Sequence, residues 1–210
     1  MSNLEEMLDN SFSQLQDKIY QAKTIHMRYS MLEKHKIFLT RQAVLSIYAA
    51  WEGFLKECLL LYLQELNTLK LKYNDLSDTY LAYQTDNICK FKNNTIHHKT
   101  IKKISKNLFN MYKQIVTFDT KINTESNANL KLTNTLLSKL SLQNLEKSKY
   151  EAGLNKLLFF RNSVAHGDSE NITIEQEDLN KFSTTIQDIA FDLIISILDG
   201  YDRQVYINNI

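Results

Sequence analysis

Apolar residues recur along most of the chain at the three- and four-residue spacing of amphipathic helices. This spacing predicts a first helix through about residue 28, a second at about residues 41–66 and a last long helix after about residue 173. In the first helix the apolar positions form a single stripe: Leu4, Leu8, Phe12, Leu15, Ile19 and Ala22. A further helix at about residues 130–140 precedes one that runs through Leu145, Tyr150 and Leu154.

Polar residues at the starts of these segments predict where the helices begin. Ser2 and Thr173 each open a capping-box pattern, and Thr40 and Ser141 are further candidates for helix N-caps. Gly200 follows the last apolar positions and is expected to close the final helix. Residues 118–129 are polar, with almost no apolar content, and are therefore predicted to form a loop.

The middle of the chain, residues 68–130, has a different and basic composition. Residues 87–118 hold seven lysines and no acidic residue, with Phe91, Phe109 and Tyr112 among them. Lysines with interspersed aromatics suit a polyanion, because each neutralised phosphate releases counterions. A lysine-rich helix face that is simply solvated is the alternative. The candidate RNA-binding residues are Lys90, Lys92, Lys99, Lys102, Lys103 and Lys106.

Composition supports a helical fold. The 210 residues include no proline and only four glycines, and 43% are hydrophobic, which is enough for a real core. We therefore predict one all-α domain over residues 1–210, an up-and-down bundle of four to five long helices with residues 68–130 as a basic helical insertion. No apolar run approaches the ~18 residues of a membrane span, and the N-terminus lacks a signal-peptide pattern. A cytoplasmic protein with no membrane partner is expected.

One polar cluster interrupts an apolar helix near residue 160. On a helix, Arg161 falls near the middle of an apolar arc, and an unpaired buried guanidinium is costly. It therefore needs a carboxylate or an external partner. Asn162 and His166 share a face, whereas His166 lies about 140° round the helix from Arg161. Gly167 predicts that the helix ends at His166, where local unwinding could bring the two groups together. The arc comprises Leu154, Leu157, Leu158, Val164 and Ala165.

Glu52 is the candidate partner for Arg161. It lies on the second helix among Leu45, Leu59 and Leu63, where a carboxylate is as out of place as Arg161 on its own helix. The alternative is that Glu52 stands at the flank of the helix, in water.

The chemistry of this cluster suits RNA cleavage. The chain has no glycine-rich phosphate loop, and no paired-cysteine or His-Glu-x-x-His array that would hold a metal. No metal and no cofactor is therefore expected. A histidine can exchange a proton near neutral pH, and an arginine can hold phosphate oxygens. These groups fit attack by the 2′-hydroxyl of RNA on its adjacent phosphate. Taken alone, His166 is better explained as a helix-terminal histidine favoured by the helix dipole, and only its combination with Arg161 and Asn162 favours a catalytic role.

The pattern Arg161-Asn162-x-x-x-His166 resembles the motif of HEPN domains (higher eukaryotes and prokaryotes nucleotide-binding). Gly167 and the upstream Trp51-Glu52-Gly53-Phe54 resemble the bacterial subgroup that includes RiboL-PSP-type members. The resemblance covers Arg41 to Leu66 and Leu145 to Leu198.

This resemblance implies a bundle of four or five helices, often a metal-independent endoribonuclease of toxin–antitoxin or antiphage systems. It implies Arg161, Asn162 and His166 as catalytic residues, a homodimer with two motifs in one cleft, and an antitoxin or defence-complex partner. Asp168 departs from the tyrosine found at this position in HEPN toxins silenced by adenylylation, so that mode of neutralisation is not predicted. The rival interpretation is a non-catalytic HEPN-like subunit that binds a nucleotide or a protein partner.

Overall fold

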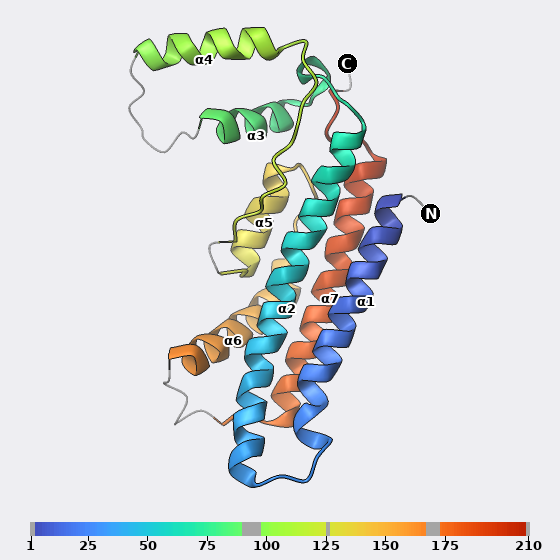
Figure 1. Ribbon diagram of the computed structural model, residues 1–210, viewed down its shortest axis with the longest axis vertical. Coiled ribbons are helices and arrows are strands. Elements are labelled where there is room, and N and C mark those ends of the chain that lie inside the picture. Colours follow the sequence, from blue (N-terminus) through green and yellow to red (C-terminus); the bar gives the residue numbers. More distant parts are fainter. Residues whose placement is uncertain (1–2, 90–97, 125–126, 167–172, 209–210) are drawn as a thin grey trace.

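Four long helices dominate the computed structural model, which describes residues 3–89, 98–124, 127–166 and 173–208 (Figure 1). They are α1 (Asn3–Thr24), α2 (Glu33–Thr68), α6 (Lys147–His166) and α7 (Gln176–Asp202). Helices α1, α2 and α7 run side by side, and α6 packs against α2 and α7. The shorter elements are α3 (Asp78–Cys89), α4 (His98–Met111) and α5 (Leu130–Lys139), with 3₁₀ turns at Ile25–Met27 and Tyr73–Asp75. The predicted all-α class is confirmed.

The hydrophobic core lies along the shared axis of the long helices. In α1 the predicted stripe faces the core: Leu4, Leu8 and Ile19 are fully enclosed, whereas Phe12 is only partly buried. Each such side chain stabilises the fold by roughly 1.5–3 kcal/mol through removal of its apolar surface from water. The largest enclosed side chains of the other elements are Trp51, Tyr62, Tyr80, Phe118, Tyr150 and Phe182.

The second helix begins earlier than its predicted cap. Helix α2 starts at Glu33, so the prediction of Thr40 as N-cap is wrong. The Thr40 hydroxyl donates instead to the Lys36 carbonyl one turn back, at 2.9 Å. Neither proline nor glycine interrupts residues 33–40, so nothing stops the helix from extending.

The other predicted boundaries also shift by a few residues. Ser141 does not cap α6, which starts at Lys147; Ser141 has a positive φ of 49° in the preceding turn. Helix α7 is capped by Glu175, with Asp178 completing the capping box, instead of by Thr173. Each helix nevertheless lies where its apolar spacing predicts it.

Gly200 lies inside α7 and does not end it. A Cβ at this position would come within 2.3 Å of the Leu142 side chain. The glycine is therefore explained by close packing of α7 against the residues before α6.

Residues 118–124 and 127–129, the described part of the predicted loop, lack regular structure as predicted, but they are not simply solvated. Phe118, Thr124 and Ala128 are each at most 2% exposed, because the segment runs along α2. Asn67 holds one end of it, accepting from the Phe118 amide at 2.7 Å and donating to the Phe118 carbonyl at 3.0 Å. The Asn67 side chain thereby satisfies both backbone groups of the buried Phe118, where no regular structure does so.

The C-terminal residues fold back onto the segment before α3. The Ser77 backbone amide donates to the Tyr206 carbonyl at 2.9 Å, and the Tyr206 side chain is only 3% exposed. That the middle region, residues 68–130, is an insertion between core helices stays a prediction.

Candidate active site

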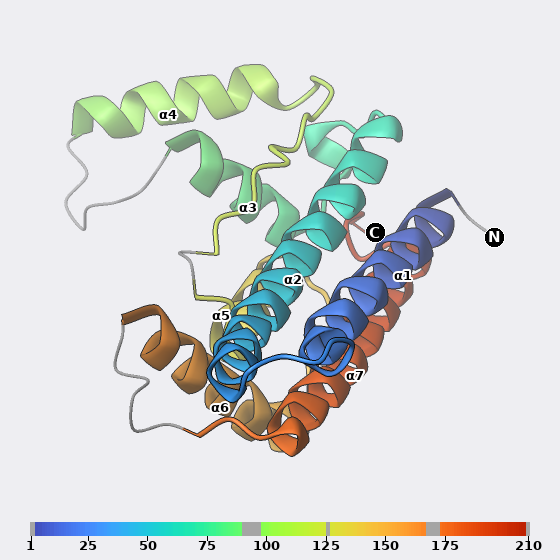
Figure 2. The ribbon, with the colours of Figure 1, turned by 60° about the horizontal axis from the view of Figure 1, so that its bottom comes forward.

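The predicted catalytic residues lie on the last turns of α6. Arg161 and Asn162 are half-buried, and His166 is exposed at the final residue of the helix. Both ribbon views show α6 running out of the bundle toward this end (Figures 1 and 2). The helix is unbroken through His166, so the predicted local unwinding is wrong. Within one chain Arg161 and His166 therefore stay about 140° apart round the helix.

Arg161 is held by neutral groups. Its guanidinium carbon lies 4.9 Å from the centre of the Tyr48 ring on α2, and Nη1 donates to the Asn162 side-chain oxygen at 2.7 Å. A cation over an aromatic face is stabilised by the ring quadrupole. Among the described residues, no carboxylate lies within 4.0 Å of this guanidinium. The arginine is thus oriented while its positive charge is not neutralised by a direct ion pair.

The predicted ion pair between Glu52 and Arg161 is not formed. The Glu52 carboxylate accepts instead from Lys56, one turn along α2, at 2.6 Å, and from the Thr124 hydroxyl at 2.5 Å. Burial raises the pKa of Glu52, but the hydrogen bonds from Lys56 and Thr124 outweigh it and hold that pKa below its usual value. The charge of Arg161 also lowers the pKa of Glu52, so the two groups lie in the same region without touching.

Tyr48 connects these groups and was not predicted from the sequence. It lies one turn before Glu52 on the same face of α2. Its hydroxyl accepts a hydrogen bond from the Ala128 amide at 2.8 Å. Burial raises the pKa of Tyr48, and the nearby Glu52 charge raises it further, so the phenol stays protonated at neutral pH. The neighbouring Trp51 donates to the Ala128 carbonyl at 2.8 Å. One buried residue of the 118–129 segment therefore fixes the ring on which Arg161 rests.

Glu52→Gln is expected to lower the free energy of unfolding by about 1 kcal/mol at neutral pH, because the amide loses the charge that holds Lys56. The pKa of Glu52 is lowered by folding, so its stabilisation is present above the unfolded pKa and is lost as pH falls through the folded value. Denaturant unfolding should show the difference from wild type narrowing between about pH 7 and pH 3. The exposed neighbour Glu57→Gln is the matched control. A loss of about 3–5 kcal/mol, typical of a broken buried pair, would contradict the observed partners.

The described candidate RNA-binding lysines lie on a different part of the molecule. Lys102, Lys103 and Lys106 are exposed on α4, which lies at the top of Figure 1, whereas the end of α6 projects from the lower half of the molecule. The side chain of Lys99, and all of Lys90 and Lys92, lie outside the described residues, as do Gly167 and Asp168. One chain therefore does not bring the described lysines to the Arg161 motif.

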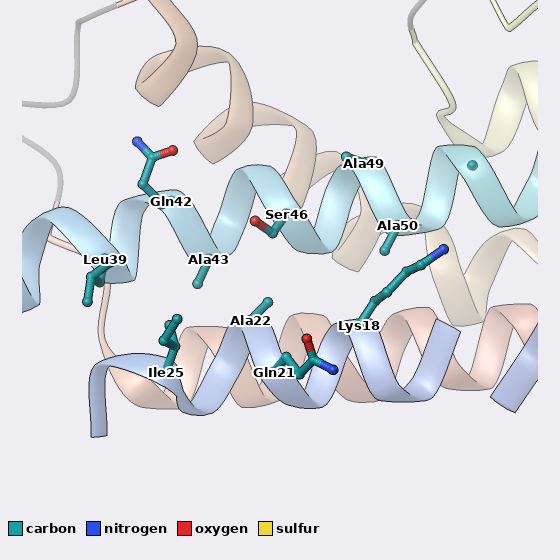
Figure 3. A pocket seen from close by; sticks show the side chains of 11 residues that line it. Lys18, Gln21, Ala22, Ile25, Leu39, Gln42, Ala43, Ser46, Ala49 and Ala50 are labelled. Carbon is teal, nitrogen blue, oxygen red and sulfur yellow. The ribbon is translucent and has the colours of Figure 1, made fainter. Parts of the chain in front are cut away.

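Four pockets of the described residues are lined by side chains other than Arg161, Asn162 and His166. A groove of about 510 Å³ lies between α1 and α2. Figure 3 shows small side chains such as Ala22, Ser46 and Ala49 along it. Gly53 of the Trp-Glu-Gly sequence lines this groove, where an added Cβ would meet open space.

The described residues contain neither a metal-binding cluster nor a membrane-spanning helix. No group of three or more His, Cys, Asp or Glu side chains lies close enough together there to hold a metal ion. In the same part of the chain, no helix combines the length and the apolar character needed to span a bilayer.

Comparison with known proteins identifies one family. A family model described as HEPN_MAE_28990-like HEPN matches residues 4–206. Neither a curated protein nor a solved structure matches the chain. The resemblance to the RiboL-PSP-type subgroup stays a prediction.

Proposed function

The chain belongs to the HEPN family, and we propose that it is a metal-independent endoribonuclease with Arg161, Asn162 and His166 as its catalytic residues. The observation that carries this proposal is the state of Arg161. A half-buried guanidinium is fixed by the Tyr48 ring and Asn162, yet no carboxylate in the described chain pairs with it. A guanidinium has five N–H donors, so one oriented in this way retains donors for the oxygens of a phosphate.

The proposed reaction uses the nucleophile that RNA itself carries. The 2′-hydroxyl loses its proton and its oxygen attacks the adjacent phosphorus, while the bond to the 5′-oxygen breaks and that oxygen gains a proton. The products are a 2′,3′-cyclic phosphate and a free 5′-hydroxyl. His166 exchanges one of these protons, and Arg161 stabilises the charge that builds on the phosphate. Asn162 orients the guanidinium through its side-chain oxygen.

The arrangement of α6 supports a homodimeric working unit. Two proton transfers are needed, and of the three proposed catalytic residues only His166 is a general acid or base. On an unbroken helix His166 points away from Arg161 of its own chain. A two-fold axis beside the exposed end of α6 would place a His166 and an Arg161 from each chain around one phosphate.

We expect cleavage of purified total RNA in the presence of excess EDTA, because the proposed reaction uses no metal. Mapped ends should carry 2′,3′-cyclic phosphate and 5′-hydroxyl groups, and single-stranded DNA should stay intact because it lacks the 2′-hydroxyl. Cleavage that stops in EDTA and returns with Mg²⁺ would contradict the mechanism. RNA binding without any cleavage would favour a non-catalytic binding subunit.

We further propose that the enzyme is a toxin or antiphage effector that acts on cytoplasmic RNA and is restrained by an antitoxin or defence-complex partner. Because the proposed reaction needs neither a metal nor a cofactor, the enzyme would cleave RNA freely unless a protein partner inhibited it. Induced expression in bacteria should stop growth, and the catalytically disabled His166→Ala chain, expressed to the same level, should not. Equal toxicity of both chains would contradict this role.

The lysines of α4 are expected to guide RNA without taking part in the chemistry. Their helix has no buried side chain among those described, and Phe109 beside them is 83% exposed, which suits stacking on a base. Lys102→Glu with Lys103→Glu should weaken RNA binding and reduce its salt dependence. Single-turnover cleavage at saturating RNA should stay within about twofold of wild type.

The matched control for this double variant is Lys121→Glu with Lys131→Glu, which makes the same charge change at exposed positions away from α4. If both double variants weaken RNA binding equally at low salt, the effect is one of net charge, and α4 is a solvated face.

A further inference from the structure

A second polar pocket lies beside the start of α7, and neither the motif nor the lysines of α4 account for it. Its volume is about 390 Å³, within the size range of small-ligand sites. It is formed by the turn after α1, the first two turns of α2 and the residues that lead into α7. The polar side chains that matter here are His26, Glu33, Lys36, Arg41, Glu175 and Gln176.

Two enclosed polar atoms at this pocket have no hydrogen-bond partner in the described chain. His26 is only 5% exposed, and its Nδ1 is one of them. The other is the side-chain oxygen of Gln176. The amide nitrogen of the same side chain donates to the Lys23 carbonyl at 3.4 Å and to the Asn180 side-chain oxygen at 3.3 Å. Leaving buried polar atoms unpaired costs roughly 1–3 kcal/mol each. Both atoms are enclosed, so a rotation of these side chains toward the pocket would let a ligand hydrogen-bond to them and recover that free energy.

The charges of the pocket indicate what kind of ligand fits. Lys36 and Arg41 bring two positive charges, and Glu33 and Glu175 bring two negative charges. A site with balanced charge does not select a simple anion. Its donors and acceptors instead match a group that carries both on one edge, as a nucleobase does. Sequence-specific proteins read single-stranded RNA through the edges of such splayed-out bases.

Helix α2 connects the pocket to the residue that supports Arg161. Arg41 is seven residues before Tyr48 on α2, so it lies on the same helix face at about 10 Å along the axis. The Arg161 guanidinium lies over the Tyr48 ring, and Gln176 is the first residue of α7, which follows the motif in the chain. An RNA strand with its phosphate at Arg161 can therefore place a neighbouring base in the pocket.

We propose that this pocket binds one base of the RNA strand, next to the cleaved phosphate, and sets the sequence preference of cleavage. The proposal rests on the proposed ribonuclease function. Arg41, Lys36 and the two glutamates contact the edge of the base, and His26 and the Gln176 oxygen take up its remaining donors and acceptors. No base contact of this kind is needed for the chemistry at Arg161 and His166.

The test is to sequence the RNA ends produced by the wild type and by two pocket variants. The wild type should favour one base about tenfold at one fixed position beside the cleaved bond. Gln176→Met and Lys36→Met should reduce that preference to less than about twofold while cleavage continues. Their matched controls, Gln42→Met and Lys34→Met, alter the same residue types outside the pocket and should keep the preference. Thermal unfolding confirms that each variant is folded.

Cleavage without base preference at any position, or a preference that both pocket variants retain, would overturn the pocket assignment and leave the ribonuclease function standing. If the wild type cleaves no RNA, the proposed function fails, and binding decides the pocket separately. His166→Ala chains should then bind short oligoribonucleotides of one base about tenfold more tightly than the others, and Gln176→Met should remove the difference. Equal binding of all four, or tighter binding of a free mononucleotide than of an oligonucleotide, overturns the inference.

Discussion

Replacing His166 with alanine is expected to lower the rate of RNA cleavage by about 10²–10⁴-fold, the usual contribution of a positioned general acid or base. The side chain is exposed on the last residue of α6, so its removal leaves no cavity. The melting temperature should therefore stay within about 2 °C of the wild type, since exposed substitutions rarely change stability by more than about 0.5 kcal/mol. The loss should appear in the chemical step, measured in single turnovers at saturating RNA.

His35 provides the matched control for this loss. It is also an exposed histidine on a long helix, but it lies near the start of α2. His35→Ala should cleave RNA at the wild-type rate. If His166→Ala retains more than about a tenth of the wild-type rate, His166 is not the group that transfers the proton. If both variants lose activity equally, the loss comes from removing any exposed imidazole and gives no evidence for catalysis by His166.

The fold was predictable because its determinants are local. The three- and four-residue apolar spacing fixes which face of each helix is buried, and the absence of proline allows the helices to be long. Helix ends were less predictable. Threonine is a residue type that often caps helices, but nothing before Thr40 stops the helix. Its hydroxyl therefore donates to a carbonyl of the preceding turn. A capping residue marks a helix start only where the residues before it favour another conformation.

Arg161 could be identified from the sequence because its charge conflicts with the apolar arc around it. Its partners could not, because they come from distant parts of the chain. The Tyr48 ring supports the guanidinium, and Ala128 fixes Tyr48 through a contact 80 residues away in sequence. The expected pairing with Glu52 was wrong for two reasons. Lys56 stands one turn away on the same helix, a local signal present in the sequence. Thr124, which donates to Glu52, belongs to a polar segment that the sequence predicts as a loop.

The pocket beside α7 gave no signal in the sequence either. Its residues come from three separate segments, and none of them stands out where it occurs. His26 becomes noticeable only when folding encloses its ring with Nδ1 unpaired. Sites assembled from ordinary residues of separate elements require the tertiary structure before they can be recognised.

A heterodimer of one wild-type chain and one His166→Ala chain is expected to lose nearly all activity. If one phosphate lies between two motifs, one His166 removes the proton from the 2′-hydroxyl and the other protonates the departing 5′-oxygen. Losing either one should then lower the rate by about 10²-fold or more. Two independent sites would instead leave half the activity, because the wild-type chain would be unaffected. A residual activity of about one hundredth indicates a shared site and one of about one half indicates two independent sites, whatever the RNA substrate.

The measurement uses co-expressed chains with two different affinity tags, purified in sequence so that only mixed dimers are assayed. A mixed dimer of wild type and His35→Ala, prepared in the same way, should keep full activity and controls for the tags and for chain exchange. A chain that remains monomeric at micromolar concentration, with RNA present, and still cleaves at the full rate would exclude the shared site. In that case both proton transfers would have to occur on one α6, where Arg161 and His166 point in different directions and a single imidazole would serve both steps in turn.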